Sequence, residues 1–422
     1  MRITSFSLLL LTACVGDDSS NPKDSGGNDV TTVSDGGNGS DVSNDATNDT
    51  AEAGPTPCGY PGEDCCKAPM APCNDGLTCS TSQPQKCMVS EAWAVGEYQT
   101  QTSNDLPTVF VVAHYDGSTW TLGTPVKQFS LSFNSNDPYD ILEVGTNVRV
   151  ISNEADVGHE YWWSGVSWQD CKLGNSCVGP TMSTFVWAIT AVSNSGSNDY
   201  WLAGSNTMYR CANGASSCTS TTNGLTSTWG QGTFAGQTAQ DLWYSQYDHV
   251  LHYDGNAWSS MSVADAYTIG DVGKDDMWVG QKQLRHWDGK AWSSAFLVQG
   301  SQTPGTILAI GGSGSKDVHA VGNDQSQTGG SFASHWDGTG WKLFPLPTGM
   351  AHVQKIYAPS PIEAFVVGAA TPAANKGMIA HWNGTAWSEM PSPTASVSGE
   401  TQPGSLTWIA VTGQARSRTG SK

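Results

Sequence analysis

The chain has 422 residues, of which 38% are apolar, so it is long enough for one large all-β ring or for two or three ordinary domains with a filled core. It holds 19 Lys and Arg against 38 Asp and Glu, which gives a formal net charge of −19. This charge argues against binding of the nucleic-acid backbone and favours solubility outside the cytoplasm.

The first residues have the pattern of an export signal. A short basic start precedes the apolar residues 3–11, and small residues then lead to Cys14. This apolar stretch is too short to cross a bilayer, which needs about 20 residues. The pattern resembles the lipobox of bacterial lipoproteins, which implies removal of residues 1–13, a lipid on Cys14 and a membrane as partner. An ordinary secretory signal is the alternative. Because Val15 follows the cysteine, an outer-membrane or cell-surface location is favoured.

Residues 14–57 are almost entirely Asp, Asn, Ser, Thr and Gly, without an aromatic residue. Such a segment buries too little apolar surface to offset the entropy of ordering, so we predict a flexible acidic tether. The spacing of its Asp residues hints at calcium, but the twelve-residue calcium loop with a closing Glu is absent.

Residues 58–89 form a module rich in cysteine and poor in hydrophobic residues. Its six cysteines are Cys58, Cys65, Cys66, Cys73, Cys79 and Cys87. An exported segment of this composition is held by disulfides, and three bridges are expected among the fifteen pairings that the spacing leaves open. Zinc is the rival, disfavoured by the oxidising compartment and by the lack of His in this segment.

From residue 90 onward, a compound unit repeats. Its clearest phrase is His-Trp-Asp-Gly-Thr-Gly-Trp at residues 335–341. Related phrases begin at His114, His252, His286 and His381, with diverged copies at residues 162–168 and 209–214. An acidic residue leads an apolar strand before each phrase, at Glu91, Asp140, Asp199, Asp241, Asp276, Asp317 and Glu363. Seven residues before the last six leads lies an apolar residue of a further strand: Phe133, Val192, Phe234, Ile269, Ile310 and Ile356.

Each unit therefore predicts four strands, with an Asp-Gly or Asn-Gly hairpin between the third and the fourth. The leads are spaced by about 45 residues, as in propeller blades. We predict an all-β, seven-bladed β-propeller over residues 90–412. The strand at residues 405–411 has no successor and the strand at 91–96 has no inner neighbour, so the C-terminal strand should complete the first blade. We expect residues 413–422 to form a flexible tail.

The repeat resembles kelch and galactose-oxidase-like seven-bladed propellers. Its Asp-Gly-x-x-Trp hairpins loosely resemble the Asp-box hairpins of sialidase-type propellers. The combination of lipobox, tether, cysteine module and ring is similar to that of bacterial surface lipoproteins, and it implies no particular chemistry.

The recurring residues have structural interpretations. The five recurring His residues are spread around the ring, so they cannot converge on one metal ion and should hydrogen-bond within their blades. The acidic leads should accept backbone hydrogen bonds, with calcium as the alternative. We expect packing between blades by the recurring tryptophans Trp120, Trp168, Trp258, Trp292, Trp341 and Trp387. No metal or other cofactor is predicted.

The four cysteines of the ring suggest two local bridges. The third blade lacks the recurring Trp, and Cys211 and Cys218 flank its turn, so a disulfide should staple this hairpin. Cys171 and Cys177 should form a second bridge on the outer strand of the second blade. Pairing between the two blades is the alternative.

Loop lengths point to a recognition surface. Short, nearly constant loops belong to one face of a propeller and loops of variable length to the other, where binding sites are usually built. Trp187, Trp229 and Trp408 precede inner strands near that face, so they are candidates for stacking on a sugar or anchoring a peptide. Ordinary core packing is the alternative for these residues.

Enzyme sites are not evident. A sialidase needs a central cluster of three Arg, a galactose-oxidase-type copper site needs a Tyr-Cys crosslink, and no Ser-His-Asp or phosphate-loop motif is visible. The sequence therefore predicts a lipid-anchored, monomeric surface protein that binds a glycan or a protein. A structural or assembly protein of the envelope is the alternative, and a polysaccharide-cleaving enzyme is a less favoured one.

Overall fold

The structure is a computed structural model, and its described residues lie in one compact unit, residues 55–422. It describes residues 65, 77–79, 85, 87–89, 91–99, 108–123, 127–128, 138–144, 147–154, 157–163, 167–170, 186–194, 197–204, 206–211, 218–222, 232–238, 240–273, 275–294, 305–324, 330–370, 376–395 and 405–413. The predictions for Cys14, the tether, Cys58, Cys66, Cys73, Cys171, Cys177 and Trp229 lie outside these residues. Within them, no helix is long and apolar enough to span a membrane.

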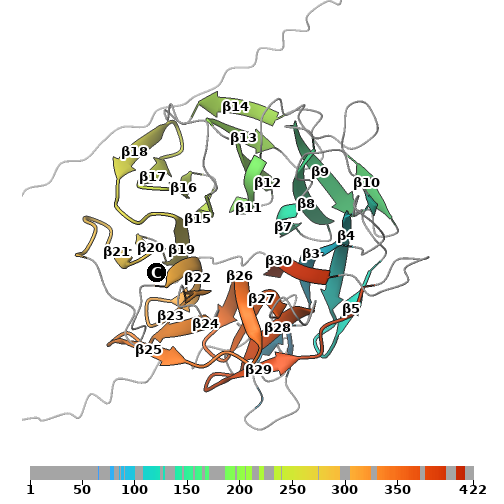
Figure 1. Ribbon diagram of the computed structural model, residues 1–422. Coiled ribbons are helices and arrows are strands. Elements are labelled where there is room, and N and C mark those ends of the chain that lie inside the picture. The colour runs from blue at the N-terminus through green and yellow to red at the C-terminus, as the bar shows by residue number, and fades with distance from the viewer. Residues whose placement is uncertain are drawn as a thin grey trace, which may run out of the picture. The chain divides into compact units, whose positions relative to one another are not determined.

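The described strands form the predicted seven-bladed β-propeller (Figure 1). The strands of each antiparallel blade are given from the axis outward. The first three blades are β30 (Ser405–Gly413), β3 (Ala92–Gln99), β4 (Thr108–Tyr115) and β5 (Trp120–Leu122); then β7 (Pro138–Val144), β8 (Asn147–Glu154), β9 (Val157–Trp163) and β10 (Trp168–Asp170); and then β11 (Val186–Asn194), β12 (Ser197–Gly204), β13 (Thr207–Cys211) and β14 (Cys218–Thr222). The last four blades are β15 (Phe234–Thr238), β16 (Asp241–Gln246), β17 (His249–Tyr253) and β18 (Trp258–Ser262); then β19 (Thr268–Gly273), β20 (Asp276–Gly280) and β21 (Leu284–Trp287); then β22 (Thr306–Gly314), β23 (Asp317–Asn323), β24 (Ser331–Trp336) and β25 (Trp341–Phe344); and then β26 (Met350–Ser360), β27 (Glu363–Ala370), β28 (Gly377–Trp382) and β29 (Trp387–Met390). We number them blades 1 to 7 in this order. The short strand β6 (Lys127–Gln128) pairs with β4.

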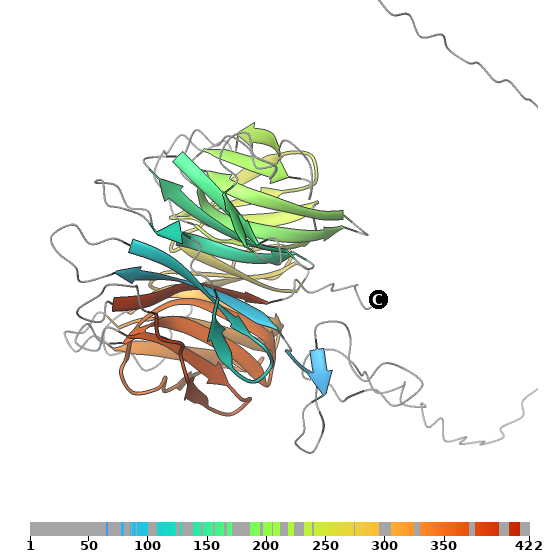
Figure 2. The same cartoon turned by 90° about the vertical axis from the view of Figure 1, so that its right-hand side faces the viewer.

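Blade 1 is completed by the C-terminal strand, as predicted. β30 pairs with β3 from Ala92 opposite Gly413 to Gln99 opposite Ser405 (Figure 2). The ring of Trp408 lies against Gly96, where a Cβ atom would approach it to 2.7 Å. Trp408 is 0% exposed and its Nε1 donates to Ser392 Oγ at 2.8 Å. Its ring is therefore part of the core, which removes Trp408 from the candidate ligand contacts.

Blade 2 differs from the predicted register. Asp140 was expected to lead the second strand after an inner strand ending near Phe133, which lies outside the described residues, but the structure places Asp140 on the inner strand β7. The second strand is β8, because Arg149 lies opposite Trp162 just as Trp243 lies opposite His252 in blade 4. Asn147 thus occupies the position that the acidic lead has in other blades, and Asp140 occupies the position of the apolar residue of the inner strand.

The misplaced acid joins two blades that are not neighbours. Lys355 Nζ, on the inner strand of blade 7, lies 3.3 Å from Asp140 Oδ2 on the inner strand of blade 2. Asp140 Oδ2 also accepts the backbone N–H of Ile189 in blade 3 at 3.4 Å. The ion pair therefore bridges the blades on either side of blade 1, where the ring is closed.

A buried carboxyl group lies on the same inner strand. Glu143 is buried beside blade 1, and its Oε2 has no hydrogen-bond partner among the described residues. Burial, and secondarily the charge of Glu91, raises the pKa of Glu143 to about 8. The carboxyl is therefore largely protonated at neutral pH.

The raised pKa of Glu143 predicts a pH-dependent stability. Between its ordinary pKa and about 8 the folded state binds more protons than the unfolded state, so the free energy of unfolding should fall as pH rises through this range. The drop between pH 5 and 7.5 should be about 3 kcal/mol. Urea unfolding across this range should show it, and Glu143→Gln should flatten the curve. An unchanged curve in this variant would contradict the assignment.

Aromatic rings hold neighbouring blades together, as predicted for five of the six recurring tryptophans, while the ring pair described for Trp168 is with Trp163 of its own blade. The outer-strand Trp of one blade packs edge to face on the second-strand ring of the preceding blade. The pairs, with their centroid distances, are Trp201–Trp258 (5.7 Å), Trp243–Trp292 (6.4 Å), Trp278–Trp341 (5.1 Å), His319–Trp387 (5.6 Å) and Phe365–Trp120 (5.9 Å). Blades 1, 4, 5, 6 and 7 thus each contribute one ring to the core of the preceding blade.

Four of the five recurring His residues hydrogen-bond within their blades, and their partners are the acidic leads. The pairs are Glu91–His114 (2.9 Å), Asp241–His252 (2.8 Å), Asp276–His286 (2.7 Å) and Asp317–His335 (2.8 Å). The fifth, His381, lies 3.9 Å from Glu363, and its Nε2 has no hydrogen-bond partner among the described residues. In blade 3 an Arg replaces the His, and Arg210 Nη2 lies 3.1 Å from Asp199 Oδ2. The acid and the His, which recur as separate motifs in the sequence, therefore form one cross-strand unit.

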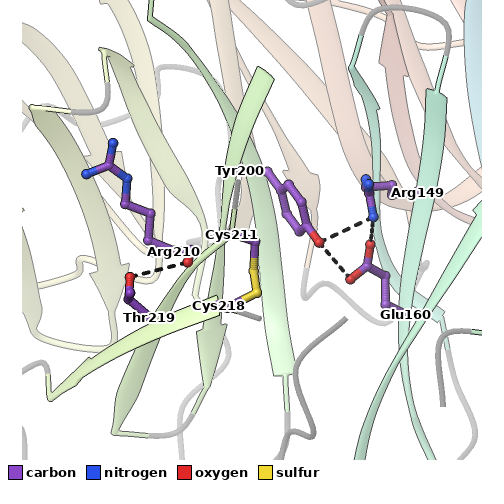
Figure 3. Close-up of a disulfide and its surroundings, with 7 residues drawn as sticks. All are labelled: Arg149, Glu160, Tyr200, Arg210, Cys211, Cys218 and Thr219. Atoms are coloured by element: carbon purple, nitrogen blue, oxygen red, sulfur yellow. Dashed lines mark hydrogen bonds and ion pairs between the residues drawn. A yellow bond between two sulfur atoms is a disulfide. The ribbon is translucent and has the colours of Figure 1, made fainter. Parts of the chain in front are cut away.

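Two disulfides are described. Cys211–Cys218 joins β13 to β14 across the hairpin of blade 3, as predicted (Figure 3). Cys65–Cys79 lies in the cysteine module, and Cys87 is also disulfide-bonded. The module ends in the small sheet of β1 (Leu77–Cys79) and β2 (Cys87–Val89).

A buried ion pair connects blades 2 and 3. Arg149 contacts Glu160 on the next strand, and both side chains are almost fully buried (Figure 3). Tyr200 Oη donates to Glu160 Oε2 at 3.1 Å, and the Arg149 guanidinium lies 4.4 Å from the centre of the Tyr200 ring. The charges are therefore paired with each other and with a residue of the adjacent blade.

Candidate ligand-binding site on the variable face

Strand connections distinguish the two ends of the blades. On the end that we call the constant face, the first and second strands of blades 2 to 7 are joined by two residues each, at 145–146, 195–196, 239–240, 274–275, 315–316 and 361–362. The hairpins between third and fourth strands also lie there. β3 begins and β30 ends at this face, so the chain enters the ring from the cysteine module on the constant face.

The recurring Asx-Gly hairpins explain the uniformity of the constant face. In each, the Asx Oδ1 accepts the backbone N–H groups two and three residues later, as Asp254 does from Asn256 and Ala257 at 2.8 and 2.9 Å. The following glycine has a positive φ, which is 96° at Gly255. This geometry is repeated at Asp116, Asp288, Asp337 and Asn383.

The opposite end, which we call the variable face, carries connections of unequal length. Between second and third strands they range from two residues, as at 247–248 in blade 4, to eight residues at 100–107 in blade 1. Between blades they range from residues 345–349 to residues 171–185. The described part of this face includes the turns of blades 4 and 5.

Tyr247 is the most exposed large hydrophobic residue described. It forms the turn between β16 and β17 with Asp248, and 49% of its surface is exposed. Its φ is 54°, a left-handed conformation that is unusual for a bulky residue. Such strain is concentrated at ligand-binding and other functional sites. The turn therefore holds an aromatic ring in solvent at an energetic cost.

A second ring lies beside the first. Tyr267, directly before β19, packs edge to face on Tyr247 with a centroid distance of 6.3 Å. Burial, and secondarily Tyr247, raises the pKa of the Tyr267 phenol. Ser245 Oγ donates to the carbonyl of Tyr267 at 3.1 Å and fixes its backbone. The two rings therefore form one surface across blades 4 and 5.

Hydrogen bonds among three hydroxyl groups fix the backbone next to this pair of tyrosines. Thr233 Oγ1 lies 3.3 Å from Ser245 Oγ and 3.2 Å from Thr268 Oγ1, and it accepts the backbone N–H of Ile269 at 2.8 Å. The three side chains tie β16 to the start of β19. The spacing of the two tyrosines is thereby set by a rigid layer of the core.

Two acidic residues adjoin the tyrosines in the chain, since Asp248 follows Tyr247 and Asp265 precedes Tyr267 by two residues. Asp248 Oδ1 accepts the backbone N–H of Asp265 at 3.1 Å, and the carbonyl of Asp248 accepts that of Val263 at 2.9 Å. Asp265 also has a positive φ, 63°. The arrangement offers apolar ring faces together with hydrogen-bond acceptors, which suits binding of a ligand that has hydroxyl groups on an apolar frame.

Of the tryptophans chosen from the sequence, Trp408 alone has a described side chain. Trp187 lies in β11, where the register shifts between Val186 and Ala188. Trp408 is buried, and Trp229 lies outside the described residues. The tyrosines were missed because neither belongs to a recurring phrase. A Tyr-Asp dipeptide between two short apolar strands was the only signal for Tyr247.

No protein-family model and no curated protein match this chain. Solved structures do resemble it. "YCF48 bound to D1 peptide" is 12% identical, with a TM-score of 0.44 over 76% of this chain and 100% of that one. The extracellular domain of BT4673 from B. thetaiotaomicron is 12% identical, with a TM-score of 0.40 over 76% and 40%. The fucose-specific lectin from Aleuria aurantia is 14% identical, with a TM-score of 0.37 over 62% and 98%.

Proposed function

We propose that this protein is a surface-displayed binding protein, held to a membrane by a lipid on Cys14, that recognises a glycan through Tyr247 and Tyr267 on the variable face. The observation that carries the proposal is the exposed Tyr247 ring, held in a left-handed turn and paired with Tyr267. Solvent-exposed aromatic residues on rigid supports are the usual anchors of a binding site.

The direction of the chain agrees with display. The cysteine module leads into β3 on the constant face, so a membrane anchor at the N-terminal end pulls on that face. The variable face is the opposite end of the same strands. A ring carried in this way presents the tyrosines away from its point of attachment.

The chemistry of the pair favours a sugar over a protein ligand. Two tyrosine rings pack against the C–H face of a pyranose, and the nearby Asp248 and Asp265 carboxylates accept its hydroxyl groups. Protein interfaces bury a much larger surface, about 800 Å² on each partner. A fixed protein partner in the envelope is the second candidate, and it would use the same face.

Glycan arrays probed with the purified protein test this function. Tyr247→Ala should weaken binding of the recognised glycan about 30-fold, as expected when a central aromatic anchor is truncated. Leu343→Ala is the matched control, because Leu343 is 40% exposed but lies on the outer strand β25 of blade 6, away from the pair. Its affinity should equal that of the unmodified protein.

Three results would contradict the proposal. Equal weakening by Tyr247→Ala and Leu343→Ala would show that the tyrosine pair is not the site. Absence of any glycan ligand, together with a protein partner lost on Tyr247→Ala, would establish the assembly role instead. Cleavage of a bound polysaccharide would establish an enzyme.

A further inference from the structure

Blade 6 departs from the other blades at one buried position. The second strand carries a ring that stacks on the recurring His: Trp93 on His114 (4.2 Å), Trp243 on His252 (4.0 Å), Trp278 on His286 (4.5 Å) and Phe365 on His381 (5.1 Å). In blade 6 this ring is His319, which stacks on His335 at 4.4 Å with an angle of 21° between the rings. Blade 6 therefore has two imidazoles where blades 1, 4, 5 and 7 have one.

The second imidazole lies beside the acidic lead of the blade. Asp317 Oδ1 is 2.8 Å from His335 Nε2 and 3.5 Å from His319 Nε2. One ligand atom from each of the three residues falls within 4.8 Å of the other two. A carboxylate oxygen and two imidazole nitrogens thus lie close enough together within a single blade to serve one ion.

The polar contact that is described for His319 is the 3.5 Å approach of its Nε2 to Asp317 Oδ1, which does not have the geometry of a hydrogen bond. The side chain of His319 is 0% exposed, and neither ring nitrogen has a hydrogen-bond partner among the described residues. Trp382 and Trp387 of blade 7 pack edge to face on it, at 5.4 and 5.6 Å. An imidazole buried among aromatic rings with both nitrogens unsatisfied is costly, and a bound cation would satisfy one of them.

We propose that Asp317, His319 and His335 bind a divalent transition metal ion, with zinc as the best fit. Zinc binds His nitrogen and Asp oxygen at about 2.0–2.2 Å, so neighbouring ligand atoms of a tetrahedral site lie about 3.3 Å apart. The two distances from Asp317 Oδ1 lie on either side of this value. Calcium and magnesium prefer sites made of oxygen alone, which this set is not.

The surroundings resemble the outer shell of a structural metal site. Ser313 donates its backbone N–H to Asp317 Oδ2 at 3.2 Å and its hydroxyl group to the same atom, which leaves Oδ1 for the ion. Outer partners of this kind orient the ligands of a metal. The 16% exposed side chain of His335 gives a route for entry. The ion would hold β23 to β24 in addition to the stacking of the two imidazole rings.

The full-length protein, freed of metal by chelation, tests this site by zinc titration with a competing dye and by elemental analysis. The intact protein should bind one zinc ion per chain with micromolar or tighter affinity. His319→Trp restores the residue that blades 1, 4 and 5 have, and it should fold normally and bind zinc at least 100-fold more weakly. His286→Gln is the control: it removes the equivalent His of blade 5, which has no second imidazole, and should leave zinc binding unchanged.

Zinc affinity that is the same with and without His319→Trp would overturn the proposal, as would failure of the unmodified protein to bind zinc or cobalt at micromolar concentrations. If His319→Trp does not fold, His319→Phe copies Phe365 of blade 7 instead. X-ray absorption at the zinc edge of the intact protein needs no variant. It should report two imidazole ligands, and a spectrum without them would reject the site.

Discussion

Removal of residues 405–422 is expected to abolish cooperative folding of the ring. This change takes away β30, the inner strand of blade 1, whose Leu406, Trp408, Ala410 and Val411 are buried between blades 7, 1 and 2. Truncation of one buried Trp costs about 3–5 kcal/mol, and whole domains are stable by only about 5–15 kcal/mol. The loss of an entire inner strand therefore exceeds what the fold can absorb. Thermal unfolding and limited proteolysis would measure it.

The matched control removes only residues 414–422, which follow β30. This variant should melt at the temperature of the full chain and resist protease equally. A cooperative transition at an unchanged temperature in the longer truncation would mean that blade 1 is stable with three strands, and the closure of the ring would then have no energetic importance.

Replacement of Arg149 by Met should lower the free energy of unfolding by about 3–5 kcal/mol, the cost of leaving a buried partner charge unpaired. Glu160 would lose its guanidinium partner in a site that is closed to water, with only Tyr200 left to donate to it. Urea unfolding at neutral pH measures the change. Simultaneous replacement of Arg149 by Met and Glu160 by Leu should recover most of the loss, because the charge is then removed together with its partner.

Arg210→Met is the control for this prediction. Arg210 forms the same kind of pair with Asp199 in the next blade, but its side chain is 37% exposed. Exposed pairs contribute about 0–1 kcal/mol, so this variant should be almost as stable as the unmodified protein. Similar losses at Arg149 and Arg210 would show that burial of the first pair is not the cause.

The ring was predictable because its repeat contains residues whose local effect does not depend on tertiary contacts. An Asp-Gly pair favours a hairpin because glycine readily adopts the positive φ of the turn. The spacing of seven residues between the inner apolar residue and the acidic lead occurs six times in the sequence, and it predicts the order of the strands. The prediction was wrong for blade 2, because Asp140 has the sequence pattern of an acidic lead residue but lies on the inner strand, where it pairs with Lys355. A single acidic residue does not show which strand it belongs to.

Pairing across strands was harder to predict than the strands themselves. The acids and the His residues recur at loop-dependent separations, so their contact becomes evident only when β-strand registers are known. Equivalent His residues in different blades lie too far apart to share a metal ion, but His319 is not one of them and stands at a position where other blades have Trp or Phe. Tyr247 was missed for a related reason, since its importance comes from a backbone conformation and from exposure.

The position of β3 has a mechanical consequence. This strand has a hydrogen-bonded neighbour on each side, β30 and β4, and it is the first strand of the ring that a force on the N-terminal segment reaches. Such a force acts along the length of β3, so the bonds of both ladders carry the load together and must slip at once. Strands loaded from one end beside a single neighbour instead peel apart bond by bond. A protein grasped at its far end and held by its N-terminal segment would therefore resist extraction of this strand.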